Sequence, residues 1–178
     1  MDTRPIGQIL VPIDFSPCSE AALRMAVMLA QVHRAVITVV HVIDTPALES
    51  LNRAGLVEAA AVGQAMGGQL KRLRHYARLN MRRLLGRVAC DGVSIRRQVL
   101  EGVPYVEVGR LARDQQVDLV VMGTYGGTVG AVDKLFFGST AEKVVRTVGR
   151  PVLTVPLVSG APSGAASPAI TQSQRSQA

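Results

Sequence analysis

Short runs that are almost wholly apolar alternate along the chain with longer segments of helical periodicity. Residues 9–13 (ILVPI) and 36–42 (VITVVHV) are apolar or β-branched at nearly every position, which is typical of strands covered on both faces. Residues 69–89 instead place apolar side chains every three or four positions, which predicts a helix with one buried stripe. In chain order, the pattern predicts strands over 9–13, 36–42, 94–100, 118–122 and 152–155, and helices over 17–32, 69–89, 104–115 and 139–148.

Alternation of strands and helices along one chain indicates crossover connections between parallel strands. The expected fold class is therefore α/β, a doubly wound, Rossmann-like open sheet with helices on both faces. Residues 1–156 are expected to form a single domain, in which the stretch 47–66 is interpreted as a loop with some helix. Residues 157–178 are rich in Ser, Ala, Gly, Pro and Gln, and such a composition predicts a disordered tail.

The positive charge of the chain is concentrated in one predicted helix. The 178 residues carry 20 Lys+Arg against 13 Asp+Glu, a formal net charge of +7. Seven cations and no carboxylate stand between Gly67 and Cys90: Lys71, Arg72, Arg74, Arg78, Arg82, Arg83 and Arg87. A solvated helix face is the favoured interpretation, and a surface for nucleic acid, an acidic protein or a membrane is the alternative. Nucleic acid is not the expected partner, because only 3% of residues are aromatic and bases would lack rings to stack on.

Several other classes of protein are excluded by composition. No apolar run reaches the ~20 residues that a membrane span needs, and no secretory signal is recognised, so we expect a cytoplasmic protein. Two cysteines do not make a disulfide framework, and Cys18 is interpreted as a space-filling residue rather than a redox group. The three histidines, His33, His41 and His75, have no recognisable nucleophile near them, so no catalytic residue is predicted.

A ligand site is expected at the carboxyl ends of the predicted strands, where open parallel sheets bind their ligands. The turn after the first strand, the end of the second and the Gly-rich loop that begins at Gly123 meet there. Glycines let amides approach phosphate oxygens, and the helix that opens at Ser139 offers unpaired N–H groups to an anion. The alternative is an ordinary flexible connection, and neither a P-loop nor a dinucleotide fingerprint is present. The candidate nucleotide-binding residues are Pro12, Ile13, Asp14, Val42, Met122, Gly123, Thr124, Gly126, Gly138, Ser139 and Thr140.

Four segments taken together resemble the universal stress protein family. They are ILVPIDFSPCSEAAL, the strand that ends at His41-Val42, DLVVMGTYG, and GSTAEKVVRTVGRPVLTVP, and they span Ile9 to Pro156 in order. The resemblance implies a five-stranded parallel sheet of order 3-2-1-4-5. It also implies a homodimer paired through the last strand, here Val152 to Val155.

Members of this family that bind ATP carry a motif of Gly, two residues, Gly, nine residues, Gly, then Ser or Thr. Gly123 and Gly126 match its first pair, and Gly138 with Ser139 matches its end, although eleven residues rather than nine lie between. Tyr125 replaces the common His of the loop. A two-residue extension of a loop costs little entropy, so the resemblance still implies ATP as ligand.

By this resemblance, Asp14 would face the ribose or a phosphate-bound Mg²⁺ ion, and Val42 would offer backbone groups to the adenine. The glycines and Gly138 to Thr140 would hold the ribose and phosphates. A purely local role for Asp14, organising the turn before Ser16, is the alternative.

The implied function is that of an ATP-binding regulatory stress-response protein, a dimeric switch whose state is read by an unidentified protein partner. Two alternatives stay open: an interaction module that binds no nucleotide, and a slow ATPase. Related enzymes that split ATP carry a Ser/Gly-rich loop after the first strand, which residues 14–19 (DFSPCS) lack, so any turnover is expected to be slow.

Overall fold

A computed structural model describes residues 5–54, 66–125 and 137–157 of the chain. The strands are β1 (Gln8–Pro12), β2 (Val36–Asp44), β3 (Ile95–Gly102), β4 (Leu119–Gly123) and β5 (Val152–Val155), and the helices are α1 (Pro17–His33), α2 (Thr45–Arg53), α4 (Met66–Arg87), α5 (Pro104–Asp114) and α6 (Ser139–Thr147). All predicted elements are present within a few residues of their expected bounds. Helix α2 covers the start of the stretch 47–66, which was interpreted as a loop with some helix, and the predicted tail from residue 158 onward lies outside the described residues.

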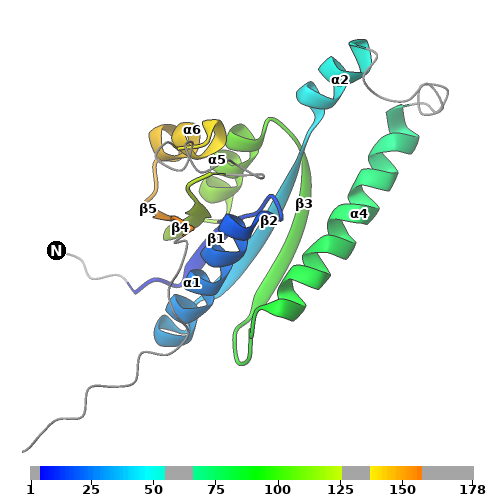
Figure 1. The fold of residues 1–178 in the computed structure, drawn as a ribbon. Coiled ribbons are helices and arrows are strands. Elements are labelled where there is room, and N and C mark those ends of the chain that lie inside the picture. The colour runs from blue at the N-terminus through cyan, green and yellow to red at the C-terminus, as the bar shows by residue number, and fades with distance from the viewer. Residues whose placement is uncertain (1–4, 55–65, 126–136, 158–178) are drawn as a thin grey trace, which may run out of the picture.

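All five strands form one parallel sheet in the order β3-β2-β1-β4-β5, as Figure 1 shows. This order confirms the expected doubly wound fold. Strand β1 lies at the centre between β2 and β4, so the direction of winding reverses beside it. Strands β3 and β5 are the edges, and all four residues of β5 are partly exposed. Within residues 5–54, 66–125 and 137–157, no helix is long and apolar enough to cross a membrane.

Two hydrophobic cores lie on opposite faces of the sheet. Helices α1 and α4 pack on one face around Ile9, Leu23 and Met81, while α5 and α6 pack on the other around Leu10 and Val108. Successive residues of β1 therefore contribute to different cores. This is why the central strands are apolar at consecutive positions rather than at alternate ones.

Candidate functional site

A cavity of about 370 Å³ lies at the carboxyl ends of the central strands. It is lined by residues of the β1–α1 turn, the end of β2, the end of β4 and the start of α6. The candidate residues that line it are Pro12, Ile13, Asp14, Val42, Met122, Gly123, Gly138, Ser139 and Thr140. The structure therefore brings together the three chain segments that the sequence directed to this edge of the sheet. Gly126 lies outside the described residues.

Thr124 is not among the lining residues, because its groups hold the ends of the loop together. Its backbone N–H donates to the carbonyl of Val155 at 3.2 Å, and its carbonyl accepts from the N–H of Gly138 at 2.8 Å. Its hydroxyl lies 3.7 Å from the sulfur of Cys18. In this structure Thr124 thus connects β4 to β5 and to the start of α6, and it does not contact the cavity.

Gly123 lines the cavity, but the structure gives a packing reason for the glycine. A Cβ atom added there would lie 3.0 Å from both the carbonyl carbon and the sulfur of Cys18. The interpretation that this glycine serves phosphate approach is therefore incomplete, since close packing of β4 against α1 already requires it. Cys18 itself is 1% exposed, and its thiol donates to the carbonyl of Val155 at 3.2 Å. These contacts favour the space-filling interpretation of Cys18.

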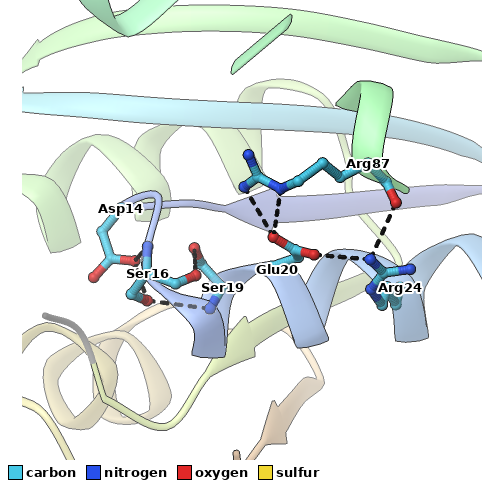
Figure 2. Close-up of polar contacts among 6 residues, drawn as sticks. All are labelled: Asp14, Ser16, Ser19, Glu20, Arg24 and Arg87. Carbon is cyan, nitrogen blue, oxygen red and sulfur yellow. Dashed lines mark hydrogen bonds and ion pairs between the residues drawn. The ribbon is translucent and has the colours of Figure 1, made fainter. Parts of the chain in front are cut away.

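Asp14 uses one carboxylate oxygen to shape the turn before α1. Its Oδ1 accepts from the N–H of Ser16 at 3.0 Å and from the Ser16 hydroxyl at 2.5 Å. Ser16 in turn caps α1 by accepting from the N–H of Ser19 at 3.2 Å (Figure 2). Within the described part of the chain, Oδ2 of Asp14 has no hydrogen-bond partner, and the side chain is exposed. The local role and a ligand role are therefore compatible, one oxygen for each.

The two helices that begin at the cavity on the α5–α6 side have no side-chain cap. Gly138 stands at the N-cap of α6 and Val103 at that of α5, and neither offers a capping hydrogen bond. The first N–H groups of a helix have no partner within it. In α1 Ser16 satisfies one of these groups, whereas in α6 Ser139, Thr140 and Ala141 line the cavity. An uncapped helix start at a cavity suits an anion such as a phosphate group.

His41 holds the β1–α1 turn from the neighbouring strand. Its Nδ1 lies 2.9 Å from the carbonyl oxygen of Ile13, and its ring packs against Phe15 with the centroids 4.5 Å apart. Phe15 adopts φ 66°, a backbone region that non-glycine residues rarely occupy. Burial lowers the pKa of His41 below its ordinary value. The ring is therefore neutral, donates Nδ1–H to Ile13 and fixes the peptide that precedes Asp14.

Glu20 joins the first turn of α1 to the end of α4, as Figure 2 shows. One carboxylate oxygen accepts from Arg24 at 2.8 Å, and the other accepts from Arg87 at 2.9 Å. Arg24 also donates to the carbonyl oxygen of Arg87 at 3.0 Å. The hydrogen bond from Arg24, and then the contacts with Arg87, lower the pKa of Glu20 against the opposing effect of burial. This triangle is the point at which α1 and α4 are tied together on their outer side.

The described residues contain no cluster of three or more His, Cys, Asp or Glu side chains that would hold a metal ion alone. Asp14 is the one carboxylate among the lining residues of the described part. A divalent ion at this place would need further oxygen ligands from a bound phosphate, as Mg²⁺ commonly has. The residues present thus fit a metal that arrives with its ligand.

Seven lining residues were not among the sequence candidates, namely Ser19, Val40, His41, Pro104, Val108, Tyr125 and Ala141. Val40 lies next to the predicted end of β2, and Ala141 follows Thr140. Pro104 and Val108 lie on α5 and reach the cavity because α5 packs across β2 and β3. The signal in the sequence that could have indicated Pro104 and Val108 was the junction of a predicted strand and helix before Pro104, because that strand also has its carboxyl end at this edge of the sheet.

The open parallel sheet of order β3-β2-β1-β4-β5 places the chain in the class of doubly wound α/β proteins. Residues 5–156 match the Universal stress protein family, and the chain belongs to that family. This confirms the resemblance stated from the sequence motifs.

Individual relatives agree with this assignment. Universal stress protein MJ0531 of Methanocaldococcus jannaschii is 31% identical over 150 residues, which cover 83% of this chain and 81% of that protein. The solved structure of protein MJ0577 from the same organism superposes with a TM-score of 0.71 at 24% identity, covering 88% of this chain and 100% of that one. A universal stress protein solved in complex with cAMP superposes with a TM-score of 0.56 at 22% identity, covering 85% and 98%.

Proposed function

We propose that the protein is a regulatory member of its family that binds an adenine nucleotide, with ATP as the expected ligand, in the cavity at the strand ends. The supporting observation is the combination in one cavity of an uncapped helix start, a carboxylate with one oxygen that has no partner among the described residues, and an apolar wall. The start of α6 suits the phosphates. The apolar residues Val42, Val108 and Met122 suit a flat base, which pockets of this kind bury. The cAMP complex of a relative supports the same chemical class.

In this proposal the Oδ2 atom of Asp14 faces a ribose hydroxyl or a phosphate-bound Mg²⁺ ion, while Oδ1 keeps the turn before α1 in place. No residue of the described part is assigned a catalytic role. The bound and free states then differ at the edge of the sheet around α6, and an unidentified protein partner reads that difference.

The test is calorimetric titration of the full chain with ATP, with and without Mg²⁺. Ser139→Asp places a carboxylate at the start of α6, where the helix dipole favours it, so the fold is retained while phosphate is repelled. We expect Ser139→Asp to weaken ATP binding at least about tenfold, and the neutral variant Ser139→Asn to bind nearly as the wild type does. No ATP binding by the wild type, or equal binding by the two variants, would contradict the proposal.

The metal role of Asp14 is tested separately by Asp14→Asn. Asparagine keeps the oxygen that accepts from Ser16 but lacks the charge. We expect the affinity for ATP to fall in the presence of Mg²⁺ and to change little in its absence. An equal loss under both conditions would exclude the metal role and would leave Asp14 a role toward the ribose or in the turn.

We also propose that two copies pair through β5. This strand is hydrogen-bonded only to β4 in the described structure, and exposed strand edges are ready partners for another strand. Pro151 and Val155 direct their carbonyl groups to β4. Since this direction alternates along a strand, and the N–H and carbonyl of one residue point to the same side, Val152 and Thr154 direct both groups to the free edge. Thr154→Pro therefore removes an outward N–H group and leaves the bonds to β4 intact. Light scattering is expected to show a dimer for the wild type and for the control variant Thr154→Val, and a monomer for Thr154→Pro. If Thr154→Pro were still a dimer, this interface would be excluded.

A further inference from the structure

A second, basic groove lies on the opposite side of the structure from α5 and α6, between α4 and the edge strand β3. Its volume is about 520 Å³. His75, Arg78 and Arg82 line it from α4 and Arg97 from β3, over an apolar floor of Met81 and Val99. Figure 1 shows α4 running alongside β3 over the length of that strand. The groove shares no lining residue with the cavity at the strand ends.

The cations of α4 do not all lack partners. Arg74, in the first half of the helix, pairs with Glu101 of β3, and Arg87 at its end pairs with Glu20. Among the described residues, Arg78, Arg82 and Arg97 form no ion pair, and each side chain is exposed. Glu101 lies four residues beyond Arg97, about 13 Å along the strand, and it is already engaged by Arg74. The three arginines therefore line one groove without an ion-pair partner in the described part of the chain.

The register of β3 makes this arrangement informative. Positions 97, 99 and 101 share the face of the strand that meets α4. At position 101 a carboxylate meets an arginine of α4, which helps to dock the helix. At position 97 the same face carries an arginine that lines the groove with Arg78 and Arg82, which are one helical turn or about 6 Å apart along α4. If residue 97 served only to pack α4 on β3, a carboxylate would be favoured there as well, because neighbouring like charges destabilise the packed state.

We propose that this groove binds an oligophosphate, a small anion with several linked phosphate groups. Guanidinium groups bind phosphate through paired N–H donors, and all three charged residues of the groove are arginine rather than lysine. A bound oligophosphate would supply the negative charge that balances the three arginines. Among the described residues, none that lines the groove is a Phe, Tyr or Trp on which a base would stack, so a nucleic-acid strand is not the favoured occupant.

The test is titration of the full chain with inorganic tripolyphosphate, at low salt and without Mg²⁺. Arg97→Glu is the main variant, and Arg83→Glu is its matched control, because Arg83 has the same charge and lies on α4 but does not line the groove. We expect Arg97→Glu to weaken binding at least about tenfold and Arg83→Glu to change it far less. Each variant is also prepared together with Ser139→Asp, which repels phosphate from the other cavity, and Arg97→Glu is expected to cause the same loss of binding in that background.

Thermal unfolding without any ligand gives an independent measurement. Arg97→Glu is expected to raise the melting temperature at low salt by about 2–4 °C, because the new carboxylate pairs with Arg78 and Arg82. A solvated helix face predicts no such gain. Arg82→Gln serves as a second variant should Arg97→Glu fail to fold, and it too is expected to weaken tripolyphosphate binding.

Four results would overturn the proposal. They are absence of tripolyphosphate binding by the wild type, an equal loss in Arg83→Glu and Arg97→Glu, loss of binding in Ser139→Asp alone, and tighter Arg97-dependent binding of a single-stranded oligonucleotide than of tripolyphosphate. ATP binding in the cavity at the strand ends is measured on its own and does not depend on the result.

Discussion

Replacing Gly123 by alanine tests how closely β4 packs against α1. The added Cβ atom would lie 3.0 Å from the carbonyl carbon and from the sulfur of Cys18, whereas ordinary contacts of this kind fall at 3.4–4 Å. The sulfur can rotate away, but the carbonyl carbon belongs to the backbone of α1. The helix or the strand must therefore shift by several tenths of an ångström.

Overpacking of this kind costs about 1–3 kcal/mol. For a chain of this length, that corresponds to a fall in melting temperature of roughly 2–12 °C. The free energy of unfolding from urea denaturation followed by circular dichroism measures the effect. Combining Gly123→Ala with Cys18→Ala is expected to restore only part of the loss, because the contact with the carbonyl carbon is retained.

Gly86→Ala is the matched control. Gly86 lies within α4, and a Cβ atom there would meet nothing within 4 Å. Alanine in an open helical position is expected to stabilise the protein by about 0.5–1 kcal/mol. If Gly123→Ala were as stable as Gly86→Ala, the close packing of β4 on α1 would be refuted, and phosphate approach would again be the reason for the glycine.

Three further perturbations probe the described contacts. Lowering the pH below 6.5, the ordinary pKa of histidine, is expected to reduce the free energy of unfolding, because the unfolded chain takes up a proton that the partly buried His41 resists. Denaturation measured across pH should show a weaker pH dependence of this free energy in His41→Asn, which keeps an N–H donor. An identical pH dependence would contradict this. Glu20→Gln should lower the free energy of unfolding by about 1 kcal/mol at pH 7, because it weakens the pairs with Arg24 and Arg87. Since the pKa of Glu20 is lowered in the folded protein, this difference from the wild type should disappear as the pH falls below 4.5. A difference that stays constant with pH would be inconsistent with the ion pairs. Asp118→Ala should lower the free energy of unfolding by about 1–3 kcal/mol, because the carboxylate accepts from the N–H groups of Gly7 and Gln8 where β1 begins. Chemical denaturation measures this loss. An unchanged midpoint would show that water replaces those hydrogen bonds.

The architecture could be predicted from the sequence because local and global signals agree. The apolar runs at 9–13 and 118–122 mark strands buried on both faces, and the start of α1 carries its own cap in Ser16 and Pro17. The segments that end at Asp14, Val42 and Met122 were directed to the same edge by the rule that parallel strands point one way. Each of these signals lies within a few neighbouring residues.

The parts that could not be predicted depend on contacts between distant residues. That Gly123 packs on Cys18, and that Thr124 bonds to Val155 and Gly138, follows from how β4, β5 and α1 meet in three dimensions. The place of Val108 in the cavity follows from how α5 crosses the sheet. Similarly, the basic helix gave no hint that Arg97 of a separate strand would join its cations, since that meeting depends on the register of α4 against β3.

The cavity at the strand ends draws its walls from both ends of the domain, from Pro12–Asp14 at one end to Gly138–Ala141 at the other. A chain that is still being synthesised has the first wall long before it has the last. Until α6 has emerged, the cavity lacks the helix start formed by Ser139 to Ala141. A ligand that requires both walls stabilises only the finished domain, by mass action, and so distinguishes complete molecules from truncated ones.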